Sequence, residues 1–96
     1  MHASIRRYKT DSAPEIARRV NEQFLSRISN VAGFLAYYAI DTGEGTIASV
    51  SIFETKEGQE ESNRVAAAWI TESLPGMLGL VEITGGEVVA HKAKSD

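Results

Sequence analysis

The sequence contains no cysteine, and this absence excludes several kinds of chemistry. The chain can form no disulfide, no thiolate metal site and no thiol nucleophile, which is compatible with a reducing compartment. It also has no apolar run of membrane-spanning length, and its first residues, MHASIRRYK, lack the apolar core of a signal peptide. We therefore expect a cytoplasmic protein without a membrane partner.

Positive charge is also scarce. The formal net charge is −3, the isoelectric point is about 5.3, and no basic stripe is present, so the sequence argues against a nucleic-acid partner. The only histidines, His2 and His91, lie near the two ends of the sequence. If the first and last strands pair, these imidazoles could meet and bind a metal, but no third ligand is evident and we expect no metal site.

Other catalytic patterns are missing as well. We find no Ser-His-Asp arrangement and no paired catalytic carboxylates. Gly43 and Gly45 flank Glu44 in a turn rather than a nucleotide loop, because no helix follows them. With 96 residues, of which 43% are hydrophobic, the chain is expected to form one domain over residues 1–96.

A predicted β-hairpin lies at the centre of the sequence, in residues 33–54. Its first strand has apolar or aromatic residues on both faces: Phe34, Ala36, Tyr38 and Ile40 on one, and Leu35, Tyr37 and Ala39 on the other. A turn containing Gly43 and Gly45 follows. The second strand, residues 46–53, is rich in β-branched residues and places Ala48, Val50 and Ile52 on one face.

A helix is predicted on each side of the hairpin. The first begins at Ser12, which forms a capping box with Glu15, and Gly33 ends the segment. The second begins at Thr55 as N-cap and stops at Leu74, because Pro75 disfavours a helical conformation there. Residues that recur at helical spacing form its apolar stripe: Val65, Ala66, Trp69, Ile70 and Leu74.

Strands are predicted at both ends of the sequence. In residues 2–9, Ala3 and Ile5 point to one face, and Ser4, Arg6 and Tyr8 to the other. The last strand, within residues 80–92, is interrupted by Gly85 and Gly86. The glycine pair indicates either a hairpin turn or one long strand bent at a bulge, and both interpretations stay open.

This order of elements predicts an α+β fold of the ferredoxin-like βαββαβ type, a four-stranded antiparallel sheet with two helices on one face. The other face of the sheet is then bare. Because the second strand is apolar on both faces, we expect a homodimer in which two sheets pack face to face. The alternative is a monomer whose open face is partly polar.

Three segments carry a family resemblance: VAGF at residues 31–34, SVSIFE at residues 49–54, and ESN at residues 61–63 followed by Trp69. With them, nearly the whole chain resembles the antibiotic-biosynthesis monooxygenase-like family of the dimeric α+β barrel superfamily. The resemblance implies a pocket between helices and sheet, and oxidation of a small aromatic or quinol-like substrate by O2 without a metal or flavin. A related branch degrades haem, but no histidine lies beyond the second helix before His91, which argues against that activity.

The resemblance implies that Asn63 and Trp69 are catalytic, as neutral donors to a substrate oxyanion. Of the adjacent tyrosines we favour Tyr38 as the one that faces the helices and the ligand, because its face carries Phe34. Arg6 and Ser4 on the first strand complete the substrate-binding set, since an arginine on a central strand is costly unless it is paired or faces a ligand.

Each of these residues also has a purely structural interpretation. Trp69 could simply pack in the core, Asn63 could be a solvated polar residue, and Arg6 could pair with a glutamate at the dimer contact or sheet edge. The resulting functional hypothesis is a cofactor-independent monooxygenase. The alternative is a non-catalytic dimeric module that binds a small molecule or has a structural role.

Overall fold

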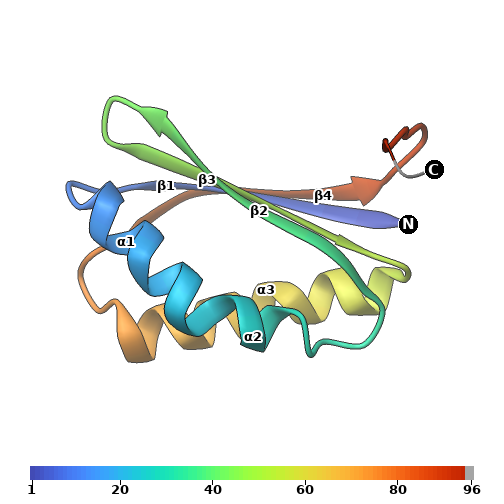
Figure 1. The fold of residues 1–96 in the computed structure, drawn as a ribbon, viewed down its shortest axis with the longest axis horizontal. Coiled ribbons are helices and arrows are strands. Elements are labelled where there is room, and N and C mark those ends of the chain that lie inside the picture. The colour runs from blue at the N-terminus through green and yellow to red at the C-terminus, as the bar shows by residue number, and fades with distance from the viewer. Residues whose placement is uncertain (95–96) are drawn as a thin grey trace.

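The computed structural model describes residues 1–94. In chain order the elements are β1 (His2–Lys9), α1 (Ala13–Arg19), the π-helical turn η1 (Val20–Phe24), α2 (Leu25–Ile28), β2 (Phe34–Gly43), β3 (Thr46–Phe53), α3 (Lys56–Ser73) and β4 (Gly79–Glu87). The strands form one antiparallel sheet in the order β2-β3-β1-β4. All helices lie on one face of this sheet (Figure 1). The predicted α+β, ferredoxin-like architecture is therefore confirmed.

The first helical segment differs from the prediction in two respects. Ser12 is the N-cap of α1, but its side chain makes no capping bond, and its backbone N–H donates to Thr10 Oγ1 at 3.0 Å. Glu15 forms ion pairs with Arg18 and Arg19 instead, so the predicted capping box is wrong. The segment also contains the π-helical turn η1, whose Val20 and Phe24 are buried against the sheet side of the core.

The second helical segment follows the prediction closely. Thr55 is the N-cap of α3, and its Oγ1 accepts a hydrogen bond from the Gly58 N–H at 3.0 Å. Leu74 is the C-cap residue, immediately before Pro75. Ala66, Trp69 and Leu74 are buried in the core between α3 and the sheet.

The two central strands present their polar residues to the helices. On β1 the buried face is formed by Ser4, Arg6 and Tyr8, and on β3 it includes Ser49 and Ser51. The alternation predicted from the sequence is correct, but the more polar set of each strand points inward. The space between sheet and helices therefore contains a polar centre within an apolar core.

The alternation along β2 is broken by a bulge. Phe34 pairs with Phe53 and Ala36 pairs with Ile52, so Leu35 is the extra residue. An extra residue reverses which face the following side chains occupy. Phe34 and Tyr37 therefore both point toward the helices, and the predicted common face of Phe34 and Tyr38 is wrong.

β4 continues as one strand through Gly85 and Gly86, which pair with Ser4 and Ala3. The hairpin interpretation is therefore wrong, and the single-strand interpretation is correct. The irregularity lies elsewhere, at Val81, because Leu80 and Glu82 pair with the adjacent residues Tyr8 and Arg7.

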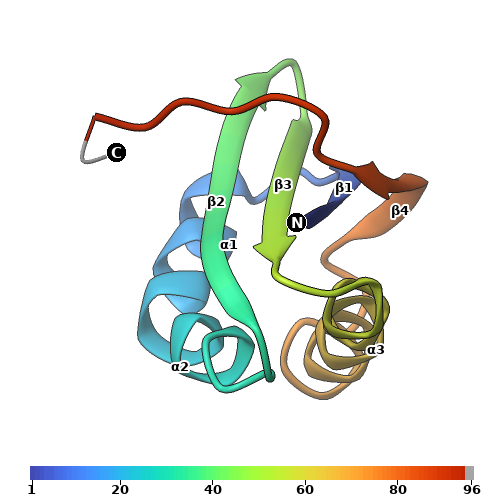
Figure 2. The ribbon, with the colours of Figure 1, turned by 90° about the vertical axis from the view of Figure 1, so that its right-hand side faces the viewer.

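The sheet face opposite the helices is apolar and open. It carries Ile5, Tyr38 and Ile40, whose exposed fractions are 43%, 57% and 46%. Within residues 1–94 no helix packs on this face, and Figure 2 shows the helices only on the other side. Large exposed apolar patches of this kind mark contact surfaces.

Candidate functional site

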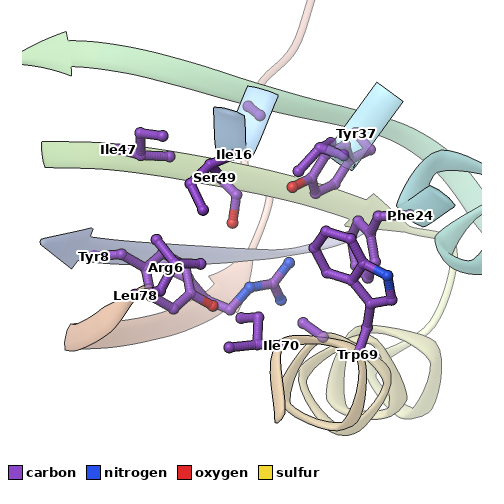
Figure 3. A pocket seen from close by; sticks show the side chains of 13 residues that line it. Arg6, Tyr8, Ile16, Phe24, Tyr37, Ile47, Ser49, Trp69, Ile70 and Leu78 are labelled. Atoms are coloured by element: carbon purple, nitrogen blue, oxygen red, sulfur yellow. The ribbon is translucent and has the colours of Figure 1, made fainter. Parts of the chain in front are cut away.

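A small internal cavity lies between the sheet and the helices. Its volume is about 30 Å³, and its walls come from β1, α1, η1, β2, β3 and α3, with Leu78 from the segment before β4. Figure 3 shows the Arg6 guanidinium projecting from β1 into this space, toward Phe24, Tyr37 and Trp69. The site therefore combines one cation with an aromatic wall, and its volume is large enough for a water molecule but not for a ring.

Arg6 is the centre of this site. It is 1% exposed, and its Nη1 donates to Asn63 Oδ1 at 2.7 Å while Nη2 donates to Ser51 Oγ at 2.9 Å. Within the described residues its Nε has no hydrogen-bond partner, and Arg6 forms no ion pair. The predicted alternative of a paired glutamate is not what the structure shows. A buried cation with only neutral partners is suited to an anionic ligand.

Asn63 orients this arginine. Its Oδ1 accepts hydrogen bonds from both Arg6 Nη1 and Ser4 Oγ, the latter at 2.6 Å. Ser4 is fully buried, whereas Asn63 is half-buried. The sequence thus predicted three residues that the fold does bring together, although Asn63 acts on Arg6 through its carbonyl oxygen.

Trp69 lines the cavity from α3, whereas Asn63 lines a groove outside it. Its ring packs on Phe24 at a centroid distance of 4.9 Å, and its Nε1–H donates to Gln23 Oε1 at 3.3 Å. Residues six positions apart on a helix point about 120° away from each other. Asn63 and Trp69 consequently do not line the same cavity, and the Trp69 donor is already engaged.

Two tyrosines complete the wall around Arg6. Burial raises the pKa of Tyr8 and of Tyr37 above the usual value for phenol, and the nearby Arg6 charge opposes this effect only in part. The Tyr37 ring also contacts Phe24 edge-on at 5.4 Å. Both phenols therefore stay protonated near neutral pH and are available as hydrogen-bond donors.

The other two predicted residues lie outside the cavity. Tyr38 is on the open face of the sheet, at the margin of a surface depression that also includes Leu25. The prediction that Tyr38, not Tyr37, faces the helices is wrong, because of the bulge at Leu35. Phe34 is half-buried in the core, where its ring packs edge-on against Phe53 at 5.8 Å.

Sequence reasoning missed Ser49, Ser51, Tyr8, Tyr37 and Gln23 as site residues. Ser49 is notable because its buried hydroxyl has no hydrogen-bond partner in the part of the chain that the structure describes. A usable signal was present in the sequence: two serines alternate with apolar residues on an otherwise hydrophobic strand. Polar residues at such positions are costly unless they serve a partner or a ligand.

The described residues contain no group of three or more side chains of the types His, Cys, Asp and Glu that could hold a metal ion. His2 pairs with Glu87 at the end of β4, and His91 lies beyond that strand. None of the helices in residues 1–94 is long and apolar enough to cross a membrane.

No protein-family model matches this sequence, and no curated protein matches it. Solved structures do match over nearly the whole chain. One is a dimeric ferredoxin-like protein from an uncultured marine organism, with 16% identity, a TM-score of 0.71, and coverage of 98% of this chain and 100% of that one. Another, provisionally classed as an antibiotic biosynthesis monooxygenase, comes from Chloroflexus aurantiacus, with 14% identity, a TM-score of 0.68 and 96% coverage of both chains.

A third similar structure is that of SnoaB, a cofactor-independent oxygenase from Streptomyces nogalater, solved as a variant with an asparagine replaced by alanine. It has 9% identity, a TM-score of 0.65, and coverage of 99% of this chain and 97% of that one. The chain therefore has the ferredoxin-like fold of the antibiotic-biosynthesis monooxygenase-like proteins. At these identities the similarity defines the fold, and the activity has to be argued from the site.

Proposed function

We propose that this protein is a cofactor-independent monooxygenase that acts on a small aromatic or quinol-like molecule. The observation that carries the proposal is Arg6, a fully buried cation that has only neutral partners and faces an aromatic wall. Such an arrangement stabilises a planar aromatic anion, and the deprotonated substrate is the species that reacts with O2. The oxygenase among the structures of the same fold adds support.

The reaction class balances without a cofactor. A ring methylene and O2 give a ring carbonyl and water, so that two C–H bonds are lost, one C=O bond forms and the substrate supplies all the electrons. The protein then has to favour ionisation of the substrate and exclude bulk water. Arg6 performs the first task by electrostatic attraction, and the buried aromatic side chains perform the second.

No general base is evident among the residues that line the cavity. Tyr8 and Tyr37 stay protonated because burial raises the pKa of each. We therefore assign them as donors that, with Ser49, hold the substrate oxygen. In this scheme the substrate is acidic enough to ionise beside Arg6, with its proton passing to solvent.

Binding of a ring requires the cavity to enlarge. A space of about 30 Å³ holds no aromatic molecule, so Trp69 and Phe24 have to move apart. Phe24 ends the π-helical turn η1, and π-helical turns occur frequently at functional sites. Asn63 then positions Arg6, Trp69 is a mobile wall residue, and Tyr38 and Phe34 contribute to substrate binding only indirectly.

We also propose that the protein is a homodimer. The open sheet face carries Ile5, Tyr38 and Ile40, each more than two-fifths exposed, and a second copy of the same face would cover them. The dimeric protein of the same fold supports this arrangement.

A second candidate function is binding without turnover. It is favoured by the small cavity and by the Trp69 N–H, which already donates to Gln23. A protein of this kind would sequester an aromatic anion beside Arg6 and release it unchanged.

Oxygen consumption separates these two functions. The wild type is mixed with a panel of anthrones and hydroquinones, and O2 uptake is recorded beside Arg6→Met and the control Arg7→Met. Arg7 is exposed on the neighbouring position of β1 and only pairs with Glu82 at the surface. We expect uptake that requires folded protein, is lost in Arg6→Met and persists in Arg7→Met. Binding without O2 uptake by the wild type would support the second function. If the wild type showed no binding and no O2 uptake, both functions would be contradicted.

A further inference from the structure

A polar groove lies outside the cavity, between the first turns of α3 and the end of β4. We call it the α3–β4 groove. Its walls include His2, Lys56, Gln59, Glu60, Asn63 and Glu87, and Gly85 and Gly86 form the strand side. Its position matters because Asn63, which lines the groove, is joined to the cavity residue Arg6 by a 2.7 Å hydrogen bond. The hydrogen-bonded pair of Arg6 and Asn63 therefore connects the cavity with the groove.

Gln59 is the unusual residue of this groove. It is 7% exposed, and its side-chain amide makes no hydrogen bond within residues 1–94. Its amide atoms are not fully enclosed, because the only fully enclosed side-chain atoms without a hydrogen-bond partner in residues 1–94 are Arg6 Nε and Ser49 Oγ. The unpaired amide therefore opens onto the groove, where its donors and acceptor can bind a group that enters.

The strand opposite is shaped around this amide. A Cβ atom at Gly85 would lie 2.6 Å from Gln59 Nε2, whereas a Cβ atom at Gly86 would meet nothing within 4 Å. Neither glycine has a positive φ, so backbone strain does not require glycine at either position. The absence of a side chain at Gly85 is thus matched to the position of Gln59.

Asn63 lies one helical turn after Gln59, so both amides are on the same face of α3. The Asn63 carbonyl oxygen is engaged by Ser4 and Arg6, and its NH2 group is left for the groove. The groove therefore offers two neutral amides side by side, directly outside the arginine.

The charges around the groove define the class of ligand. Glu60 and Glu87 line it together with Lys56 and His2, so it has no excess of positive charge. A carboxylate would gain nothing beside the two glutamates. A neutral carbonyl or carboxamide group can satisfy both amides, because it offers the complementary acceptor and donor.

We infer that the α3–β4 groove binds a neutral carbonyl or carboxamide substituent of the aromatic ligand, and that Gln59 is its specificity-determining residue. This inference rests on the proposed function, in which Arg6 holds the anionic oxygen of the same molecule. Gln59 distinguishes substituted from unsubstituted aromatic anions.

The test uses three probes that share one ring: naphthol, hydroxynaphthamide and hydroxynaphthoate. Binding to the wild type is followed by proton–nitrogen correlation NMR. The indole N–H of Trp69, the only tryptophan, reports on the cavity. The side-chain NH2 of Gln59, assigned by its loss in Gln59→Leu, reports on the groove.

For the wild type we expect hydroxynaphthamide to bind about tenfold more tightly than naphthol, as one or two additional neutral hydrogen bonds would give. Hydroxynaphthoate should bind no more tightly than naphthol. All three probes should shift the Trp69 signal, and only the carboxamide should shift the Gln59 signal.

Three variants test the assignment to Gln59. Gln59→Leu removes the amide at nearly constant size, and Gly85→Ala displaces the amide while keeping it. Both should abolish the tenfold preference without weakening naphthol. Gly86→Ala is the matched control and should keep the preference, because its new methyl group meets open space.

The outcomes for the groove and the cavity are distinct. A shift of Trp69 with no shift of Gln59 and no preference would overturn the groove inference while leaving the proposed function intact. A shift of Gln59 alone would support the groove and contradict the cavity function. The groove inference would be overturned if Gln59→Leu and Gly85→Ala both kept the preference for hydroxynaphthamide, or if hydroxynaphthoate bound more tightly than naphthol. If neither the Trp69 nor the Gln59 signal shifted, the groove inference and the proposed function would both be overturned.

Discussion

Arg6→Met is the substitution that most directly separates function from stability. Methionine fills a similar volume without a charge, and it removes a buried cation that forms no ion pair in residues 1–94. If Arg6 is present for a ligand, the fold does not need it and the variant should be at least as stable. If Arg6 holds the structure together, the same substitution should be strongly destabilising.

The magnitude follows from the contacts of the guanidinium. Two hydrogen bonds are lost, to Asn63 and Ser51, each worth about 1.5–3 kcal/mol when one partner is charged. Burial of an ion costs several kcal/mol, and replacement of buried ions by apolar groups is often neutral or stabilising by roughly 1–4 kcal/mol. Asn63 Oδ1 keeps its bond from Ser4, whereas the buried Ser51 hydroxyl is left without Arg6 as a partner, which costs about 1–3 kcal/mol and offsets part of the gain. We expect the free energy of unfolding to stay unchanged or to rise by up to about 2 kcal/mol.

The assay is urea unfolding followed by Trp69 fluorescence. All samples are kept at one protein concentration, because the stability of the proposed homodimer would depend on concentration. A gain of 1 kcal/mol would also raise the melting temperature by about 4–8 °C in a domain of this size. The control Arg7→Met loses only an exposed pair with Glu82 and should change stability by no more than about 1 kcal/mol.

A loss of about 3 kcal/mol or more in Arg6→Met, with Arg7→Met unchanged, would refute this reasoning. Arg6 would then be a structural residue, as a buried group whose removal leaves its partners unsatisfied. Unchanged ligand binding by a stable Arg6→Met variant would refute the functional half by itself.

Three further predictions concern packing and titration. Gly58→Ala should lower the free energy of unfolding by about 1–3 kcal/mol in urea titrations, because its Cβ would lie 2.7 Å from the carbonyl oxygen of Ala32, and an unchanged midpoint would contradict the packing shown. The pKa of the Glu15 carboxyl should be about 2 in an NMR titration, because hydrogen bonds from Arg18 favour the charged form. The stabilisation by this carboxylate is therefore present above the usual carboxyl pKa and is lost as the pH falls through about 2. A measured pKa near 4 would refute the ion pair. Burial raises the pKa of Tyr37, so its phenol ionises at lower pH in the unfolded chain than in the folded protein. The free energy of unfolding should therefore fall as the pH rises above about 10. Alkaline unfolding curves that coincide for the wild type and Tyr37→Phe would argue against this effect.

Some features of the fold follow from short stretches of sequence. The N-cap Thr55 and the stop at Pro75 define α3 because capping and proline effects act within one helical turn. The alternation in β1 and β3 is also local, since side chains change face at every residue. These signals determined the order and type of the elements, and hence the fold class.

The same local reasoning could not determine the faces of β2. The bulge at Leu35 depends on how β2 pairs with β3, and a single extra residue exchanges Tyr37 and Tyr38 between the cavity and the open face. The capping box at Ser12 was wrong for a different, local reason. Glu15 had stronger partners in Arg18 and Arg19, which lie on the outer surface of the same helix.

The sequence by itself determined that Arg6, Ser4 and Asn63 are candidates, because polar residues on a central strand and near the start of an amphipathic helix require an explanation. Only the tertiary structure decided that they form one hydrogen-bonded cluster, that Trp69 faces away from Asn63, and that Gln59 lies against Gly85. Those relations join residues more than twenty positions apart or depend on the rotation of a helix against the sheet. Such geometry is set by packing of the whole core, and no local pattern of residues specifies it.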